Sequence, residues 1–523
     1  MIRRILVKDL KLLWPMAVLM TAIQAARAWV GQGVSFFADP TASNALVPPL
    51  TVAWFVGLAS LAAAVVQLDP VPGVDQDWLI RPIRRRDLVL AKLLFLALVV
   101  SVPMLLLDLA TGWVAGIPFG AILGAAVARV LFVYACFLLP VAALAAMTRS
   151  LTELIALAAA LVVVFAVSLS VSFVVRGGAW CPTCGSGMAW LEHFAQHAIT
   201  VVGALLILGL QYGRRRTNLS RGLALAGAAA LVLLQMPWSG AFALERWAMG
   251  SGRGAAVALV PESSEVPIRR ESSGSRHDAA PVLGRDVGRA LDYLHRRAGR
   301  EAASISLDIP LRIQGVAPEE RLLVDRSEAR VAGADGHVLE LPPVAGWRAG
   351  LSADSSGDPM SAGPATQTVE LPAGAYRRLD GGGAQLIVTD TLTLVGPAAV
   401  LEIEAGDGAA RTPDGGVCIS RVQRDRVTVG CRAVGAAPFC YGASLYTADG
   451  PLGSPVLKCD ADYRRHWPTL IDVLTPYGVE LSAPESGGRA DRAALEAARV
   501  RFTIYRELDH FERRIALALR ASR

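Results

Sequence analysis

Four residues with metal-binding or redox-active side chains lie within one short stretch. Cys181 and Cys184 are two residues apart, and His193 and His197 follow at a spacing that shares one helical face. Two thiolates and two imidazoles can complete a tetrahedral zinc site. The sequence WCPTC is also typical of a redox pair, and a local disulfide is the simplest interpretation. The sequence leaves the disulfide, the zinc site and redox chemistry open.

A second group of residues is suited to binding an acidic partner. It lies between Asp69 and Lys92, in a polar segment flanked by two long apolar runs. The segment combines the apolar side chains of Trp78, Leu79 and Ile83 with Asp87 and the cations of Arg81, Arg84, Arg85, Arg86 and Lys92. These residues can present an apolar and cationic surface to a protein, or they can hold the segment against anionic lipid.

Signatures of hydrolases and nucleotide-binding enzymes do not occur in the chain. There is no G-x-x-x-x-G-K-[ST], no H-E-x-x-H and no G-x-S-x-G. The histidines after His197 are scattered without partner spacing. We therefore expect no enzymatic activity and no cofactor in this chain, the zinc alternative aside.

The charge balance divides the 523 residues into two halves. The first 240 residues hold 17 Lys and Arg against 9 Asp and Glu, whereas the remainder holds 34 against 36. The basic excess therefore belongs to the apolar half, where it orients membrane helices. Nucleic-acid binding requires a clustered basic face on a soluble domain, so we expect no nucleic-acid partner.

The apolar half contains about seven segments long enough to cross a membrane. They span residues 15–36, 48–68, 93–112, 119–147, 151–175, 190–212 and 222–238, after an amphipathic stretch at 2–14. Basic loops at 69–92, 148–150 and 213–221 alternate with loops that carry one basic residue or none. Because basic loops stay in the cytoplasm, we expect a cytoplasmic N-terminus and an extracytoplasmic C-terminal half.

Three ionisable residues fall at membrane depth. We expect Arg27 and Asp108 to extend toward an interface, since charge is costly in lipid. For Arg129 the sequence leaves an interfacial position and the bundle interior open.

Cysteine positions fit this topology. Six of the seven cysteines fall on the extracytoplasmic side, which favours disulfides among Cys181, Cys184, Cys418, Cys431, Cys440 and Cys459. The last four allow three pairings, and the sequence does not choose between them.

After residue 240 the pattern changes. We interpret residues 241–285 as a linker and 286–523 as a β-rich, sandwich-like domain with a few helices. Alternation predicts strands at 305–313, 385–395, 399–404, 426–431, 499–507 and 511–520. Helices are expected at 286–298, 467–475 and 488–498, and Pro310 indicates an edge strand.

Residues 1–240 resemble the permease subunits of ABC-2 type transporters. The resemblance is carried by VKDLKLLWP, by IRPIRRRDLVLAKLLF with Pro82, Arg84, Arg85, Asp87 and Lys92 in register, and by FLLPVAALAAMTRSLTELIA at 137–156. Two features depart from that family, which usually has six spans, a cytoplasmic C-terminus and no large external domain.

The resemblance implies a multi-pass protein of the bacterial inner membrane, a homodimer or heterodimer of permeases, and a separate ABC ATPase that binds the ATP. Trp78, Ile83, Arg84, Arg85, Arg86, Asp87 and Lys92 would contact that ATPase in an export or envelope-related system. The alternative function is a non-transporting anchor or sensor, whose β domain binds an envelope partner.

Overall fold

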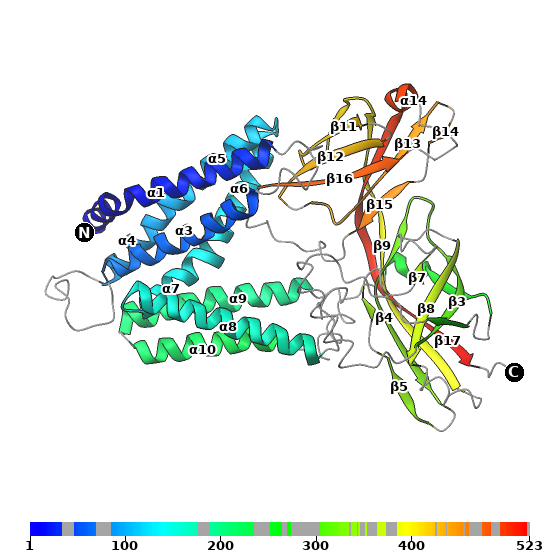
Figure 1. The fold of residues 1–523 in the computed structure, drawn as a ribbon, viewed down its shortest axis with the longest axis horizontal. Helices are drawn as coiled ribbons and strands as arrows, with labels where there is room; N and C mark the ends of the chain where they lie inside the picture. The colour runs from blue at the N-terminus through cyan, green and yellow to red at the C-terminus, as the bar shows by residue number, and fades with distance from the viewer. Residues whose placement is uncertain are drawn as a thin grey trace.

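The structure, a computed structural model, separates the chain into a helical N-terminal half and a β-rich C-terminal half (Figure 1). It describes residues 1–33, 46–69, 85–175, 189–214, 216–234, 252–263, 269–272, 304–333, 336–341, 344–345, 351–352, 363–372, 384–423, 426–435, 437–448, 450–452, 455–459, 473–482 and 492–519. A helical bundle followed by a β region is the architecture that the sequence predicts.

The bundle is built from helical rods, some of which join two helices end to end. The helices are α1 (Ile2–Gly33), α3 (Val47–Gln67), α4 (Arg85–Leu96), η2 (Ala97–Ser101), α5 (Val102–Val114), α6 (Phe119–Val133), η3 (Tyr134–Leu138), α7 (Leu139–Met147), α8 (Leu151–Val175), α9 (Ala189–Leu208), η4 (Gly209–Arg214) and α10 (Thr217–Leu234). Among the described residues, five helices are long and apolar enough to cross a membrane: 47–67, 86–114, 119–147, 194–214 and 217–234. A further apolar helical stretch, Leu151–Leu161 in α8, is shorter than these five.

Helix α1 differs from the expected pair of segments. The amphipathic stretch at 2–14 and the first predicted span form one helix that continues through Pro15. Its buried residues Ile5, Asp9, Ala17 and Met20 lie at helical spacing. The charge pattern alone predicted that the first turns lie separately in the membrane interface. They do not, because this face packs in the bundle.

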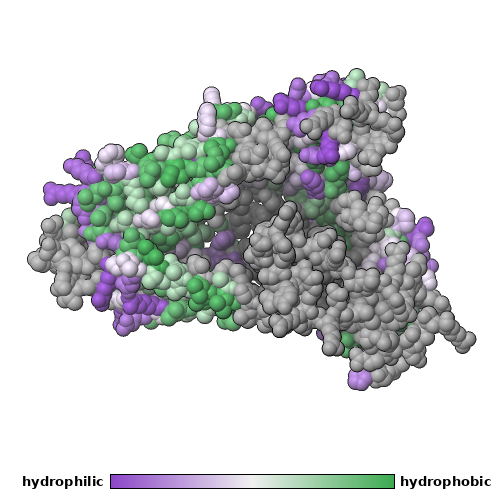
Figure 2. All heavy atoms as spheres, viewed as in Figure 1, coloured by the Kyte–Doolittle hydropathy of each residue, from purple (hydrophilic) through white to green (hydrophobic). Residues whose placement is uncertain are grey.

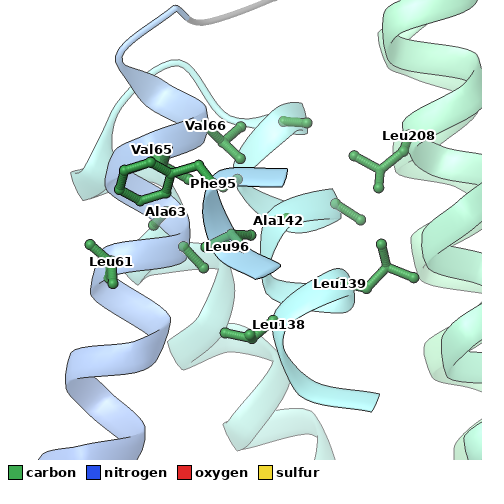
Figure 3. Close-up of a cluster of buried hydrophobic side chains, with 14 of the residues drawn as sticks. Leu61, Ala63, Val65, Val66, Phe95, Leu96, Leu138, Leu139, Ala142 and Leu208 are labelled. Carbon is green, nitrogen blue, oxygen red and sulfur yellow. The ribbon is translucent and has the colours of Figure 1, made fainter. Parts of the chain in front are cut away.

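Small residues allow the helices to approach closely. Ala62 and Ala63 of α3, Ala91 of α4 and Ala142 and Ala143 of α7 are buried in one cluster with larger Leu, Val and Phe side chains (Figure 3). Without a hydrophobic driving force inside lipid, such close packing is what holds membrane helices together.

Two π-helical segments lie just before prolines. Segment η2 precedes Pro103 and η3 precedes Pro140. A proline cannot donate the backbone hydrogen bond to the carbonyl four residues earlier, so the helix widens locally instead of ending. The rods α4–η2–α5 and α6–η3–α7 therefore remain continuous in direction although their hydrogen bonding changes.

The bundle surface is apolar along its flank and polar at its N-terminal end (Figure 2). Leu94, Leu98, Leu106, Leu131 and Val163 are among its exposed apolar side chains. A contiguous apolar surface of this kind is stable when lipid covers it instead of water.

The described strands of the β region form three antiparallel sheets. A 3-10 turn, η5 (Arg253–Ala256), precedes the strands. The strands are β1 (Ala258–Pro261), β2 (Arg269–Ser272), β3 (Ser304–Gln314), β4 (Arg321–Ala332), β5 (Val338–Glu340), β6 (Val344–Ala345), β7 (Leu351–Ser352), β8 (Gly363–Pro372), β9 (Ala384–Glu404), β10 (Ala409–Arg411), β11 (Val417–Gln423), β12 (Arg426–Val434), β13 (Cys440–Thr447), β14 (Gly450–Pro451), β15 (Val456–Cys459), β16 (Leu474–Ser482) and β17 (Arg499–Leu519). The first sheet is ordered β1–β3–β8–β7, with β2 also on β3, and the second β10–β11–β12–β16. The third sheet is ordered β14–β13–β17–β9–β4–β5, with β15 on β13 and β6 on β4.

Two sandwiches share the third sheet. One part of the third sheet packs on the first sheet and buries Leu307 and Ile309 of β3 against Leu386 and Leu392 of β9. Its other part packs on the second sheet, burying Val427 and Val479 with Ile403 and Phe502. The long strands β9 and β17 pass through both parts (Figure 1).

Several strand predictions need correction. The segments 385–395 and 399–404 are one strand, β9, and the segments 499–507 and 511–520 are likewise one strand, β17. Register shifts between Ile504 and Tyr505 and between Glu507 and Asp509 absorb the Gly396-Pro397 step without ending the pairing. Loss of alternation at such bulges explains why each strand appears divided in the sequence.

Other predictions have mixed outcomes. Strand β3 confirms the strand predicted at 305–313. Pro310 does not mark an edge strand, because β3 has strand partners on both sides. Pro310 lies between the parts of β3 that pair with β1 and with β2, where no strand partner needs its missing N–H. Helix α14 (Arg492–Ala497) confirms the described part of the helix expected at 488–498, whose first four residues lie outside the described residues. The end of the helix expected at 467–475 is instead the start of β16, and the helix expected at 286–298 lies outside the described residues.

The β region contacts the bundle at one end of α5 and α6. Ile117, Ile122 and Ala126 are buried in one cluster with Val473 and Leu474 at the start of β16. Helices α5 and α6 meet tightly beneath this contact, since a Cβ on Gly112 would lie 2.3 Å from Cγ1 of Ile122. The β region is thus joined to the bundle by packing as well as by the chain.

Candidate functional site

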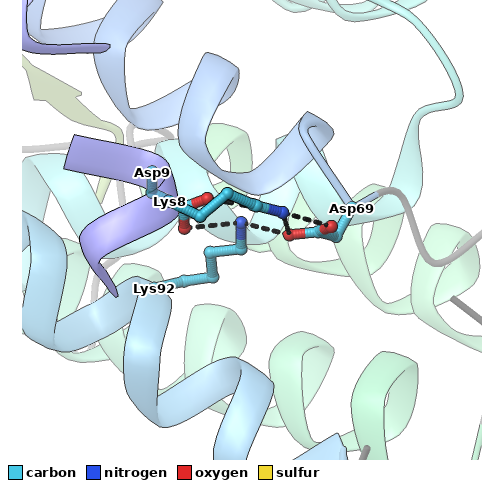
Figure 4. A network of polar contacts seen from close by, with 4 residues as sticks. All are labelled: Lys8, Asp9, Asp69 and Lys92. Atoms are coloured by element: carbon cyan, nitrogen blue, oxygen red, sulfur yellow. Dashed lines mark hydrogen bonds and ion pairs between the residues drawn. The ribbon is translucent and has the colours of Figure 1, made fainter. Parts of the chain in front are cut away.

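Four charged side chains meet at the N-terminal end of the bundle, where the segment 69–92 begins and ends (Figure 4). The ammonium of Lys92 in α4 lies 2.9 Å from Oδ2 of Asp9 in α1 and 2.6 Å from Oδ2 of Asp69 after α3. Lys8 reaches the same Asp69 at 2.8 Å. The network therefore ties both ends of the segment to the first helix.

Two members of this network are buried. Asp9 is fully buried and Lys92 is 2 % exposed, whereas Lys8 lies at the surface. Burial alone would raise the pKa of Asp69, but hydrogen bonds from Lys8 and Lys92 outweigh it and hold that pKa below its ordinary value. The two lysines thus hold the Asp69 carboxylate in its charged form.

The segment's predicted contact residues fall into three groups. Trp78, Ile83 and Arg84 lie outside the described residues, and of Arg85 only the backbone, at the start of α4, is described. Arg86 is exposed and Asp87 lies in the first turn of α4, where a carboxylate is favoured by the helix dipole. Lys92 needs correction: its ammonium is buried against Asp9 and Asp69, so it supports the segment from inside instead of presenting charge to a partner.

A second ion pair stabilises the same end of the bundle. Arg221 of α10 donates to Oε1 of Glu153 in α8 at 2.6 Å and to the carbonyl of Met147. Glu153 also accepts from the backbone N–H of Arg149. The basic loops at 148–150 and 213–221 are thereby joined.

A polar cluster lies deep in the bundle, toward the end that carries the β region. Arg129 forms an ion pair with Asp108, and both are buried. The structure therefore places Arg129 in the bundle interior. The expectation that Arg27 and Asp108 extend to an interface is wrong, because Asp108 faces Arg129 and Arg27 lies over Trp54, 5.1 Å from its ring centroid.

The cysteines of the β region form two disulfides, Cys418–Cys431 and Cys440–Cys459. In each case the two cysteines are direct partners in an antiparallel pair, β11 with β12 and β13 with β15. Sheet register thus selects one of the three pairings that the sequence allows. Cys136, in η3, is a free thiol.

The predicted zinc site is described only in part. Cys181 and Cys184 lie outside the described residues, and of His193 only the backbone in α9 is described. His197 packs edge-on against Phe132 at 4.8 Å between ring centroids. No group of three or more candidate metal ligands occurs among the residues that the structure describes.

Sequence reasoning missed Asp9, Asp69 and Trp54 as site residues. Asp9 carried a signal, because it is the single acidic residue in a basic stretch between Arg3 and Lys11. Asp69 directly follows an apolar run. A carboxylate at the end of such a run can remain charged when it is paired. Trp54 carried no such signal, since an apolar helix often contains an aromatic residue.

The comparisons with known proteins add no family. No protein-family model matches the sequence, and no curated protein matches it.

Proposed function

We propose that this chain is the membrane subunit of an ABC-type export or envelope-related system in a bacterial inner membrane. In this proposal seven helices span the membrane and the N-terminus is cytoplasmic. A separate ATPase binds the segment around Trp78–Asp87, and the extracytoplasmic β region binds a substrate or an envelope partner.

The observation that carries the proposal is the ion pair between Lys92 and Asp9. These residues belong to VKDLKLLWP and IRPIRRRDLVLAKLLF, two of the three segments on which the resemblance to ABC-2 permeases rests. They are 83 positions apart and meet in a buried network at the end of the bundle opposite the β region. A loop that receives force from an ATPase needs such fixed ends, whereas a loop that only orients the helices does not.

The helical rod after the loop supports a coupling role. Helices α4, η2 and α5 continue from Arg85 to Val114, about 45 Å at 1.5 Å per residue. Lys92 lies near the start of this rod, and the contact of Ile117 with Val473 and Leu474 lies just beyond its end. A displacement of the loop would therefore reach the β region through one continuous helical rod.

Recovery of the ATPase tests the proposal. The full chain, purified from native membranes in a mild detergent, is expected to bring down a P-loop ATPase at moderate salt. Reversing the charge of Arg84 and Arg85 together should remove the ATPase. The matched control reverses Arg312 and Arg426, which lie exposed in the β region. If the ATPase survives the first double variant, or never appears, the non-transporting anchor becomes the better explanation.

Side-specific labelling tests the orientation separately. A cysteine at Asp407, which is exposed in the β region, should react with a membrane-impermeant maleimide in spheroplasts. A cysteine at Asn218, exposed at the start of α10, should react only after lysis. The opposite pattern would reverse the proposed topology.

A further inference from the structure

An exposed apolar tip lies where helices α5 and α6 are joined, at the end of the bundle that carries the β region. Trp113 and Val114 at the end of α5 are 77 % and 74 % exposed, and Phe119 at the start of α6 is 59 % exposed. The tip continues the apolar flank of the bundle, since Leu106, two turns before Trp113 on α5, is exposed as well. Large apolar side chains gathered at one exposed place mark an interaction surface.

The second sheet rests on this tip. In the turn between β10 and β11, a Cβ on Gly415 would lie 3.5 Å from Cδ of Pro118 and 3.1 Å from Cβ of Ala121. Val434, at the end of β12, packs in the cluster that joins the β region to the bundle, and β16 leads away from that cluster (Figure 1). One end of the second sheet is therefore level with the ends of α5 and α6.

A row of the second sheet near this end carries two arginines on its outer face. Arg411 of β10 and Arg432 of β12 both pair with Val417 of β11, so the three residues lie side by side. Cys418 and Cys431 in the next row are fully buried inside the sandwich, and alternation therefore places the arginine row on the outer face. Arg411 is exposed and Arg432 is half-buried, so Arg411 is the cation that can extend farthest from the sheet.

The arginine row lies at headgroup level if the helices of the bundle cross a membrane. Arg432 is two residues from Val434, so the row is at most about 7 Å beyond the contact with the bundle. The headgroup layer on each side of the hydrocarbon core is roughly 5 to 8 Å thick. Trp113 and Phe119, at the helix ends, lie where aromatic side chains collect at membrane interfaces.

The acidic side chains of the second sheet do not cancel this charge. Asp407 and Glu480 form ion pairs with Arg421 and Arg426, which lie in rows farther from the bundle. Asp414, exposed in the turn beside the arginine row, offsets one of its two charges. The row and the turn together thus remain positive.

We propose that the apolar tip and the arginine row together form a binding surface for anionic phospholipid headgroups, which holds the second sheet on the membrane. Trp113 and Phe119 enter the interface between headgroups and acyl chains, and Arg411 donates hydrogen bonds to the lipid phosphate. A leaflet fits this surface better than a protein partner. The tip is continuous with the flank that lipid covers, and the basic row complements an anionic headgroup.

This inference rests on the membrane-spanning bundle of the proposed function. It requires neither the ATPase nor one orientation of the chain, because the surface meets a leaflet on whichever side of the membrane the β region lies. No residue of the loop 69–92 takes part in it.

The test uses the full chain in nanodiscs of mixed phosphatidylcholine and phosphatidylglycerol, without any ATPase. Cys136, Cys181 and Cys184 are replaced by serine, and a fluorophore is attached to a new cysteine at Pro413, which is exposed in the turn beside Gly415. Quenching by a nitroxide near the top of a lipid acyl chain reports contact with the leaflet. The same nitroxide carried by phosphatidylglycerol or by phosphatidylcholine, at equal mole fraction, reports enrichment of the anionic lipid.

We expect quenching of the fluorophore at position 413, and stronger quenching by phosphatidylglycerol than by phosphatidylcholine. Ser482→Cys carries the fluorophore at the far end of the same sheet and should show no quenching. Arg411→Gln should lower the enrichment of phosphatidylglycerol up to about fivefold, because one arginine near the membrane surface is lost. Arg411→Lys should retain most of the enrichment. Arg426→Gln makes the same chemical change on the same face, far from the bundle, and should leave the enrichment unchanged.

Loss of this enrichment in Arg411→Gln but not in Arg426→Gln would support the proposal. Absence of quenching at position 413, equal quenching by the two lipids, or an enrichment that Arg411→Gln does not change would overturn it. A fluorophore at Leu106→Cys, on the apolar flank, reports the bundle itself. Quenching there without quenching at position 413 would overturn the headgroup surface alone, whereas no quenching at Leu106→Cys would contradict the membrane-spanning bundle of the proposed function.

Discussion

The Nζ atom of Lys92 lies 2.9 Å from Oδ2 of Asp9, and this ion pair is buried where α1 and α4 meet. A buried pair of this kind is more valuable as a geometric constraint than as a source of stability, because desolvation offsets much of the attraction. Removal of one partner is different, since the other charge then remains buried alone.

The first prediction concerns this pair. Lys92→Met should lower the free energy of unfolding of the bundle by about 3–5 kcal/mol, because Asp9 loses its counter-charge. Thermal unfolding of the purified chain measures the loss. Lys8→Met is the matched control: Lys8 is about half exposed, so its pair with Asp69 should contribute about 1 kcal/mol or less. Equal losses in the two variants would contradict the assigned roles.

The second prediction concerns the disulfides. Non-reducing peptide mapping should recover Cys418 with Cys431 and Cys440 with Cys459, and no crossed pairs, because each pair faces directly across two strands. Cys418→Ala with Cys431→Ala should lower the stability of the β region by about 2–4 kcal/mol. Cys136→Ala serves as the control, because this thiol is free. Recovery of Cys418 linked to Cys440 would show that the sheet register is wrong.

The third prediction concerns Asp390, a buried carboxyl between the first and third sheets. Burial raises its pKa from 3.8 to about 7, and its cross-strand partner Ser327 offsets only part of this rise. Because the folded state then holds a proton that the unfolded state releases, stability should fall as the pH rises from about 4 to 7 and stay level above that. The full effect corresponds to roughly 4 kcal/mol.

Substitution isolates this contribution. Asp390→Asn should stabilise the chain at pH 8 and have little effect near pH 4, as measured by thermal unfolding across that range. Glu480→Gln, at an exposed carboxylate, should leave the pH dependence unchanged. A pH profile of Asp390→Asn parallel to that of the wild type would rule out this role for the buried carboxyl.

The fourth prediction concerns the contact between the bundle and the β region. Gly415 lies in the turn before β11 with a φ of +87°, and a Cβ added there would lie 3.1 Å from Cβ of Ala121 in α6. Gly415→Leu should therefore strain the backbone and also force this contact apart. Hydrogen exchange should become faster in both Ile117–Ile122 and Val473–Thr475.

Gly336 provides the matched control. It has a similar φ of +80° in the turn between β4 and β5, but a Cβ there would meet no atom within 4 Å. Gly336→Leu should cause comparable backbone strain and leave exchange at the bundle contact unchanged. Faster exchange at 117–122 in both variants would mean that strain alone, and not the contact, explains the effect.

Much of the architecture could be predicted from local patterns. The long apolar runs predict the helices of the bundle, and the alternation of Ile305, Leu307, Ile309 and Leu311 predicts β3. Such patterns are local because they record which face of one element avoids water. They do not record where an element meets an irregularity, so the bulges of β9 and β17 appeared in the sequence as strand ends.

The candidate sites were less predictable. Lys92 appeared to belong with the arginines of its loop, yet the structure pairs it with Asp9, 83 residues earlier. Arg27, Asp108 and Arg129 appeared as separate charges in three apolar segments, and only their convergence on Trp54 and on one another shows a cluster.

Hydropathy and alternation in the sequence predict a membrane-like helical half followed by a β-rich half with an even set of cysteines, because both patterns depend on neighbouring residues alone. The folded structure is needed to find which charges are buried together, which cysteines are bonded and where the β region rests on the bundle. Ion pairs, disulfides and packing contacts join residues that are distant along the chain. Their partners are fixed by how the helices and strands pack, which no short stretch of sequence records.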